Sequence, residues 1–288
     1  MHVLDLLTLL SALVVVLAGA SVIIDLTHPL SSSSIYWPGV PSFNRTRLMA
    51  GVNKNNVWIE IGVFTSGEHG GTHVDAPRHF NPKGYDLKDL PLELTIADGV
   101  MIDARAEAAN NSDYALTVRK IEEWEKQHGR IPDQAAVIIN TGWTNRWPNQ
   151  HLFFNSNNTD DPSTFHFPTV SKEAAQWLVN HRQLRMLGVD VPAPDGPRDE
   201  MFPVHSLLLP RNIVILENLM IPDSLPPRDF RLHASPIRIE GGSGTQARIY
   251  AMLYDDVSGG SPGCSYAWVP TRVLWVLLSC IYYLLLSL

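Results

Sequence analysis

The feature that most constrains this chain is a dense run of metal-binding residue types at positions 69–79. It contains His69, His73, Asp75 and His79. Two imidazoles and a carboxylate are ligands that Zn²⁺ and Mn²⁺ accept, and such a set leaves open positions for water or substrate. Gly70, Gly71 and Pro77 favour an irregular loop around the ion, following a strand at residues 57–64. The run predicts a catalytic metal site; its alternative is a histidine-rich surface loop.

The same run carries a resemblance to a known family. It fits the pattern H-x-G-T-H-x-D-x-P-x-H of the metal-dependent cyclase-like hydrolases, which include bacterial kynurenine formamidase and isatin hydrolase. Further similar segments lie at residues 24–30, 37–39, 141–143, 188–190 and 236–241. The resemblance covers roughly residues 22–254. It implies an α/β fold of the swivelling β/β/α type, in a single domain, and a homodimer.

The resemblance also implies a set of site residues. Its primary metal ligands are His69, His73 and Asp75, and His79 is the residue that transfers protons. A later pair, His205 and Glu217, would complete a site for one or two ions of Zn²⁺ or Mn²⁺. Read without the family, Glu217 ends an apolar run, where a buried carboxylate needs a cation or hydrogen-bond donors. A salt bridge at the end of a strand therefore stays open for Glu217.

These residues indicate an enzyme, a metal-dependent amidohydrolase in which the ion activates water and no acyl-enzyme forms. The leading substrate is an aryl formamide such as N-formylkynurenine. Opening of a cyclic amide of the isatin type is one alternative, and a catalytically inactive surface binding protein is another. Four aromatic residues could line a pocket for a flat substrate or belong to the core: Trp37, Trp58, Phe80 and Trp143. His28, in the opening motif, is left outside the site.

Other catalytic patterns are weaker. The run at residues 241–245 approaches the nucleophile elbow G-x-S-x-G but has Thr245 in place of the second glycine. A serine hydrolase is therefore not expected, and the run is interpreted as a turn. Both cysteines, Cys264 and Cys280, lie beyond the catalytic region, which excludes a cysteine nucleophile or a cysteine zinc cage.

The two ends of the chain predict its location. Residues 1–20 combine an apolar stretch with small residues before Ser21, as in a secretory signal peptide. Residues 259–288 have the order of parts of a GPI-attachment signal after an acceptor at Ser258, or else form a membrane anchor. Glycosylation sequons begin at Asn44, Asn110 and Asn157. The chain is thus expected in the secretory pathway and outside the cell, anchored to the membrane.

The remaining 21–258 region predicts one mixed α/β domain. A formal net charge of −7 argues against a nucleic-acid partner and leaves a small molecule as the expected ligand. Strands are predicted at residues 57–64, 99–104, 136–140, 186–191, 213–217 and 247–254, and helices at 117–127 and 171–182. The polar segment at 145–168 is predicted to be a long loop and a lid.

Overall fold

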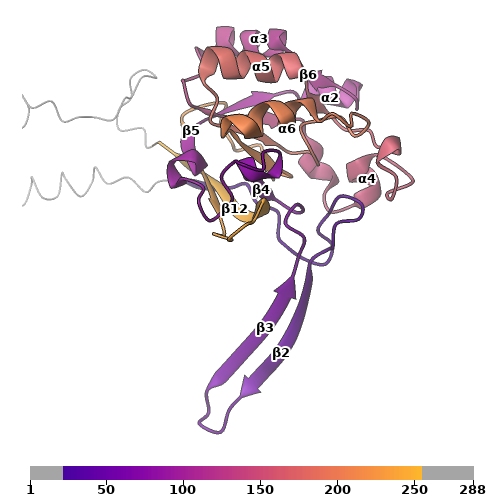
Figure 1. Ribbon diagram of the computed structural model, residues 1–288, viewed down its shortest axis with the longest axis vertical. Helices are drawn as coiled ribbons and strands as arrows, with labels where there is room; N and C mark the ends of the chain where they lie inside the picture. Colours follow the sequence, from indigo (N-terminus) through magenta and orange to yellow (C-terminus); the bar gives the residue numbers. More distant parts are fainter. Residues whose placement is uncertain (1–21, 255–288) are drawn as a thin grey trace, which may run out of the picture. The chain divides into compact units, whose positions relative to one another are not determined.

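The computed structural model describes residues 22–254 of the chain (Figure 1). The signal peptide predicted at 1–20 and the anchor predicted at 259–288 lie outside the described residues. Within residues 22–254, no helix has the length and apolar character needed to cross a bilayer.

A curved eight-stranded sheet forms the centre of the fold. Its strand order is β1–β12–β11–β5–β7–β9–β10–β4, and β4 pairs with β12 as well as with β10. The strands are β1 (Ile23–Asp25), β4 (His73–Asp75), β5 (Ile96–Asp103), β7 (Ala136–Asn140), β9 (Met186–Val189), β10 (Val214–Glu217), β11 (Phe230–Pro236) and β12 (Gly244–Leu253). The extra pairing of β4 closes the sheet into a barrel-like ring. This is the predicted α/β class, and five of the predicted strands belong to this sheet.

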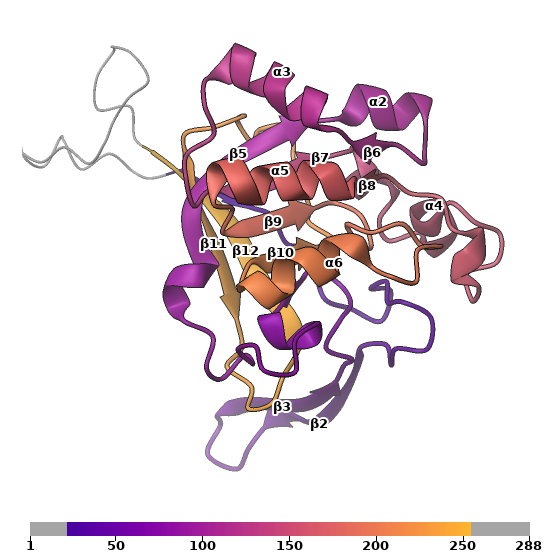
Figure 2. The same cartoon turned by 45° about the horizontal axis from the view of Figure 1, so that its top comes forward.

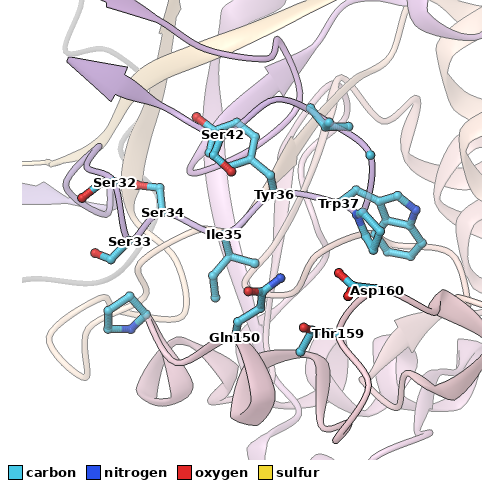
Figure 3. A pocket seen from close by; sticks show the side chains of 14 residues that line it. Ser32, Ser33, Ser34, Ile35, Tyr36, Trp37, Ser42, Gln150, Thr159 and Asp160 are labelled. Carbon is cyan, nitrogen blue, oxygen red and sulfur yellow. The ribbon is translucent and has the colours of Figure 1, made fainter. Parts of the chain in front are cut away.

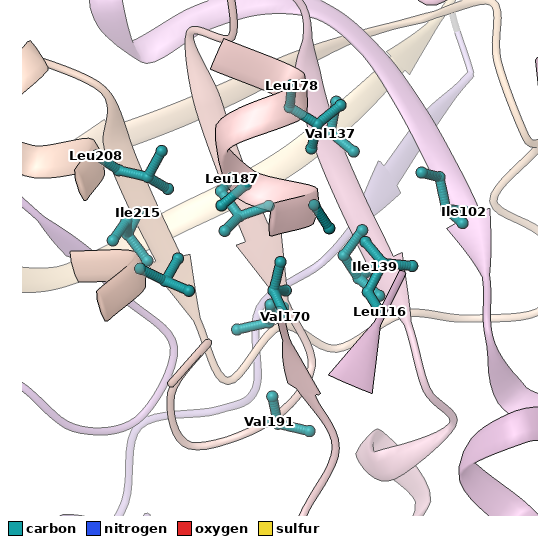
Figure 4. Packing of buried hydrophobic residues seen from close by; sticks show 14 of the residues in the cluster. Ile102, Leu116, Val137, Ile139, Val170, Leu178, Leu187, Val191, Leu208 and Ile215 are labelled. Carbon is teal, nitrogen blue, oxygen red and sulfur yellow. The ribbon is translucent and has the colours of Figure 1, made fainter. Parts of the chain in front are cut away.

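Two apolar clusters cover the two faces of the sheet. Side chains alternate between faces along each strand, so in β7 Val137 and Ile139 belong to one cluster and Ala136 and Ile138 to the other. The first cluster packs beneath the helices (Figure 4). The second fills the interior of the ring. The continuous apolar sequence of the parallel strands follows from burial on both faces.

Helices cover the outer face of the parallel strands (Figure 2). Both predicted helices are confirmed: α3 (Val118–His128) begins after Thr117 and α5 (Lys172–Arg182) after Ser171, whose side chains accept a backbone N–H from the first turn. The prediction missed α2 (Arg105–Asn110), α4 (Gln150–Phe154) and α6 (Pro203–Leu208). Short 3₁₀ turns are η1 (Pro77–His79), η2 (Leu92–Thr95), η3 (Trp143–Arg146), η4 (Pro162–Thr164) and η5 (Leu209–Arg211), and β6 (Ala115–Leu116) pairs with β8 (Thr169–Val170).

The segment at 145–168 is not the polar lid that its composition predicted. It contains α4, η4 and the last two residues of η3. Its four phenylalanines, Phe153, Phe154, Phe165 and Phe167, are fully buried in the outer cluster. The rings of Phe154 and Phe165 stack at 4.1 Å between centroids. Buried aromatic surface of this size fixes the segment to the body, so it is part of the core.

One pair of strands stands apart from the main sheet. β2 (Asn44–Val52) and β3 (Trp58–Thr65) form an antiparallel hairpin that projects from the body (Figure 1). The strand predicted at 57–64 is therefore confirmed as a strand but lies outside the sheet that carries the site. The three sequon asparagines, Asn44, Asn110 and Asn157, are all exposed.

Candidate metal centre

The motif at 69–79 is more regular than its glycines suggested. His73 and Asp75 lie in β4, a strand of three buried residues, and not on an irregular loop. β4 pairs antiparallel with β10 on one side and with β12 on the other. The predicted loop was wrong because Gly71, which has φ +60°, and Pro77 mark the two ends of a short strand.

Strand register places the predicted ligands on one face. Val74 is 0% exposed and belongs to the cluster inside the ring, so His73 and Asp75 point to the opposite, helix-covered face. Glu217 of β10 is the cross-strand partner of His73, and directly opposed residues share a face. The sheet thus brings together three predicted ligands that are up to 144 positions apart.

The fourth ligand, His205, comes from α6. Its Nδ1 donates to Asp195 Oδ2 at 2.6 Å, so in the neutral ring Nε2 carries the lone pair that an ion could bind. Asp195 also accepts the backbone N–H groups of Val204 and His205, at 2.7 and 2.9 Å. One buried carboxylate therefore orients both the helix and its imidazole, an arrangement typical of metal-bound histidines.

His69 reaches the centre from the loop before β4. Gln246 Nε2 donates to the backbone oxygens of Gly67, Glu68 and Gly70, at 2.9, 3.3 and 3.0 Å. A Cβ on Gly244 would lie 2.4 Å from His69 Cε1. The imidazole therefore fits only because β12 has a glycine at this position.

The candidate ligand atoms converge on a common point. His69 Nδ1 lies 2.7 Å and His73 Nε2 3.3 Å from Asp75 Oδ1. His205 Nε2 lies 3.4 Å from Asp75 Oδ2 and 3.2 Å from Glu217 Oε1. His73 Nε2 is also 3.3 Å from Glu217 Oε2. Two overlapping groups could each hold an ion, His69–His73–Asp75 and Asp75–His79–His205, with Asp75 common to both.

Several of these atoms are buried without a hydrogen-bond partner. They are His73 Nε2, Asp75 Oδ2 and Glu217 Oε1. His73 Nδ1 donates to the backbone oxygen of Gly71 at 3.0 Å, so in the neutral ring its Nε2 carries the lone pair. Unpaired lone pairs at this depth are costly unless a cation satisfies them. The donor set therefore fits a divalent ion.

The pKa values of the buried imidazoles and carboxylates are shifted by the attraction between their opposite charges. Burial alone lowers the pKa of His73, but without an ion the nearby carboxylates of Asp75 and Glu217 favour the protonated ring and raise that pKa to about 10. Burial likewise opposes the charged form of His205, yet without an ion its pKa lies well above the usual value because the carboxylates of Asp195, Asp75 and Glu217 favour the protonated ring. For Asp75, the imidazoles offset burial and hold its pKa well below the usual range. The pocket thus strongly favours positive charge beside its carboxylates.

His79 lies in η1, directly after the ligand strand. Its ring stacks on His69 at 3.9 Å between centroids and is 5.9 Å from the ring of His205. Burial lowers the pKa of His79 to about 4, so the ring is neutral at pH 7 and can accept a proton. The next residue, Phe80, stacks on His205 at 4.8 Å and contacts Phe202 at 5.6 Å.

His69 also takes part in an arrangement that resembles a serine triad. Its Nδ1 faces Asp75, and its Nε2 lies 2.9 Å from Ser243 Oγ. However, Ser243 Oγ donates to Glu68 Oε2 at 2.6 Å, so it accepts from His69 Nε2 and has no proton to give to it. In that tautomer the lone pair at Nδ1 faces a carboxylate oxygen, a contact that a bound cation would relieve. We therefore interpret Ser243 and Glu68 as groups that orient the His69 ring.

Sequence reasoning missed Ser243, Glu68 and Asp195. Ser243 was interpreted as part of a turn, and indeed it ends the turn before β12, but its hydroxyl contacts His69. Glu68 directly precedes the motif, and that position was the available signal. Asp195 lies in a loop without periodicity, and no local pattern indicates that it is buried.

Of the four aromatic residues that could line the site or belong to the core, only Phe80 contacts the candidate ligands. Trp58 is on the projecting hairpin, and Trp143 is buried with its Nε1 donating to Phe153 O. Trp37 packs against the core and lines a separate cavity of about 360 Å³ (Figure 3). That cavity is lined by residues 32–40, by Ser42 and by parts of 148–160, and none of the candidate ligands lines it.

His28, left outside the predicted site, packs elsewhere. It stacks on Trp147 at 4.4 Å between centroids, and its Nε2 is 3.1 Å from Thr144 Oγ1. Its backbone N–H donates to Thr72 Oγ1. Burial lowers its pKa to about 4. These contacts give His28 a packing role.

Several known proteins are similar to this chain in sequence and in fold. A family model described as "Putative cyclase" matches residues 24–196. An isatin hydrolase from Roseibium aggregatum is 29% identical over 252 residues, 82% of this chain and 94% of that protein. A kynurenine formamidase from Geobacillus thermodenitrificans is 29% identical over 227 residues, 78% and 94% of the two chains. The structure of isatin hydrolase A from Ralstonia solanacearum superposes with a TM-score of 0.74 at 31% identity, covering 88% and 98%.

The barrel-like sheet, the cluster of imidazoles and carboxylates, and the similarity to isatin hydrolases and kynurenine formamidases together define a metal-dependent hydrolase. The chain belongs to the cyclase family.

Proposed function

We propose that this protein hydrolyses the C–N bond of an amide attached to an aromatic ring. The observation that carries the proposal is the convergence of His73 Nε2, Asp75 Oδ2 and Glu217 Oε1, buried and unpaired, beside His205. A divalent ion held by these residues and His69 would polarise the carbonyl and lower the pKa of water. Zn²⁺ and Mn²⁺ both accept this donor set, for one or two ions.

His79 supplies the proton transfer. Because its ring is neutral at pH 7, it can take a proton from the attacking water and deliver it to the leaving nitrogen. The amide C–N bond breaks as the new C–O bond forms, giving a carboxylate and an amine. Phe80 beside His79 offers an apolar ring against which an aryl group can pack. Ser243 is not the nucleophile, because its proton is directed to Glu68.

Two substrate classes compete. A cyclic amide of the isatin type is favoured by the similarity to isatin hydrolases over most of the chain. An aryl formamide such as N-formylkynurenine is supported by the similarity to kynurenine formamidases. The sequence interpretation placed the formamide first because of His205 and Glu217. That pair completes the metal centre and says little about the shape of the substrate, so both classes are tested.

The test measures initial rates on isatin and on N-formylkynurenine with the purified protein loaded with Zn²⁺ or Mn²⁺. We expect turnover of one of them, and we expect His79→Ala to lower it by about 10²–10⁴-fold while the bound metal stays unchanged. His166→Ala is the matched control, since that histidine pairs with Asp113 at the surface. Metal-loaded protein that hydrolyses neither compound would favour a surface binding protein instead.

We also propose that the protein is exported and anchored outside the cell. The proposal is supported by the apolar stretch and small residues before Ser21 and by the small residues and apolar tail after Ser258. The exposed sequon asparagines are compatible with it. Treatment of intact cells with a phosphatidylinositol-specific phospholipase C should release activity into the medium. Retention on the cells would favour a membrane-spanning tail, and activity already in the medium a freely secreted protein.

A further inference from the structure

Asn218 lies between the two strands that carry His73 and Glu217. It directly follows Glu217, the last residue of β10 and the cross-strand partner of His73. Asn218 is only 4% exposed, and its φ of +55° is a left-handed conformation that asparagine adopts more readily than most residues. A polar side chain buried beside two candidate ligands is costly unless its hydrogen bonds offset the loss of water.

The side chain of Asn218 contacts the backbone of the ligand motif. Its Nδ2 donates to the backbone oxygen of Gly71 at 2.9 Å. The same oxygen accepts the Nδ1–H of His73 at 3.0 Å. Because a carbonyl oxygen can only accept, the group of Asn218 that faces it is the amide NH₂. One carbonyl therefore connects Asn218 to the imidazole of a candidate ligand.

The main chain of Asn218 is tied to the same motif. Thr72 Oγ1 donates to the backbone oxygen of Asn218 at 2.6 Å. The backbone N–H of Asn218 donates to the oxygen of Val191, just beyond the end of β9, at 3.1 Å. These bonds continue the contact between β4 and β10 past their last ladder pair. Asn218 is thus held on both sides, and its amide has a fixed position.

We propose that Asn218 is a positioning residue of the metal centre, which fixes the direction of the Gly71 carbonyl and through it the ring of His73. An imidazole that donates its second N–H to a fixed acceptor keeps one tautomer and one orientation. Glycine is the residue with the most backbone freedom, so a carbonyl at Gly71 gains most from a second donor. The inference rests on the proposed metal centre and not on the choice of substrate.

The other end of the amide supports this role. The Oδ1 of Asn218 is buried and has no hydrogen-bond partner among residues 22–254. An apolar side chain of similar size would avoid this unsatisfied acceptor, but it could not donate to Gly71. The contact to Gly71 is therefore what an amide provides at this position.

The experiment compares Asn218→Gly with Asn212→Gly by calorimetric titration of Zn²⁺. Asn212 is the matched control, because it has φ +59°, is exposed and lies just before the same strand. Glycine adopts both conformations without strain, so each variant reports the loss of the side chain. We expect the Kd for Zn²⁺ to rise by about 10–100-fold in Asn218→Gly and by less than about threefold in Asn212→Gly.

Proton exchange provides a second measurement. In the Zn²⁺-loaded wild type, NMR should show that the side-chain amide of Asn218 exchanges with solvent much more slowly than that of Asn212. The Nδ1 proton of His73 should exchange faster in Asn218→Gly than in the wild type. A merely structural role would lower the Tm of the metal-free protein and leave Zn²⁺ affinity and this exchange unchanged.

Three results would overturn the proposal. They are an unchanged Zn²⁺ affinity in Asn218→Gly, equal weakening in Asn212→Gly, and fast exchange of the Asn218 amide in the wild type. The last of these needs no variant, so it decides the matter even if Asn218→Gly does not fold. A wild type that binds no ion would overturn the metal centre and this inference together. Zn²⁺ binding without hydrolysis of either compound would overturn the proposed function alone.

Discussion

The metal centre and the β2–β3 hairpin depart from ordinary packing in opposite ways. At the centre, polar atoms of His73, Asp75 and Glu217 are buried without partners. On the hairpin, the apolar side chains of Met49, Ile61 and others are exposed without cover. A buried lone pair without a partner is costly, and a bound cation removes that cost. Exposed apolar surface is likewise costly in water, and contact with another apolar surface removes that cost. Each mismatch therefore indicates the chemistry of what binds there.

The largest expected loss of metal and of activity comes from replacing Asp75, which belongs to both groups of residues that could hold an ion. Asp75→Asn replaces the carboxylate that contacts three imidazoles by a neutral amide. We expect loss of stoichiometric metal, and loss of hydrolysis beyond the roughly 100-fold that an outer-sphere change causes. Metal analysis and initial rates measure both. Asp103→Asn, an exposed carboxylate paired with Arg105, serves as control. If Asp75→Asn still held its full metal content, the centre would be wrongly placed.

Removing the ion should also destabilise the fold. A ligand at 100 times its Kd contributes about 2.7 kcal/mol to the free energy of unfolding. For a domain of this size we expect a chelator to lower Tm by about 5–10 °C, as calorimetry can show. The Asp75→Asn protein should not respond to the chelator. An unchanged Tm in the wild type would mean that the buried lone pairs do not bind an ion.

A smaller effect is expected from the carboxylate behind His205. Asp195→Asn keeps the shape but disturbs the acceptor of His205 Nδ1, and we expect metal affinity to fall by about 10–100-fold. Titration calorimetry with Zn²⁺ measures it. The control is Glu200→Gln, an exposed acid in the neighbouring loop. Equal metal affinities in the two variants would mean that Asp195 only accepts the backbone N–H groups at the start of α6 and does not tune His205.

Ser243→Ala tests whether Ser243 orients the His69 ring or acts as a nucleophile with His69 as its base. If Ser243 only orients the ring, metal affinity and turnover should fall less than about tenfold, the worth of one neutral hydrogen bond. If it were a nucleophile, turnover would vanish while metal binding stayed unchanged. A serine-directed reagent, diisopropyl fluorophosphate, should leave the wild type active.

The smallest expected effect is the change in stability caused by a substitution on the exposed hairpin, compared with one inside the ring. Ile61→Lys should change the free energy of unfolding by less than about 0.5 kcal/mol, because the side chain is 49% exposed. Ile138→Ala, inside the ring, should cost about 2–5 kcal/mol. Urea unfolding measures both. A large loss in Ile61→Lys would show that the hairpin packs on its own body.

The sequence predicted what local pattern encodes. The strands at β5, β7, β9, β10 and β12 and the capped helices α3 and α5 follow from apolar runs and from Thr117 and Ser171. The candidate ligands could be named because the motif and the resemblance supply them. Their convergence could not, because it depends on β4 pairing with both β10 and β12. Ser243 and Asp195 escaped for the same reason, since hydrogen bonds between distant residues leave no periodicity.

The double pairing of β4 has a consequence for folding. A three-residue strand contributes little stability of its own, so it takes its place only once β10 and β12 are in position. Until then, His69 and His73 are two neighbouring histidines in a flexible chain, without the carboxylate of Glu217 or the imidazole of His205. Tight ion binding should therefore develop late in refolding, after most helical structure has formed. A metal-sensitive dye added during refolding would report the moment at which the ring closes.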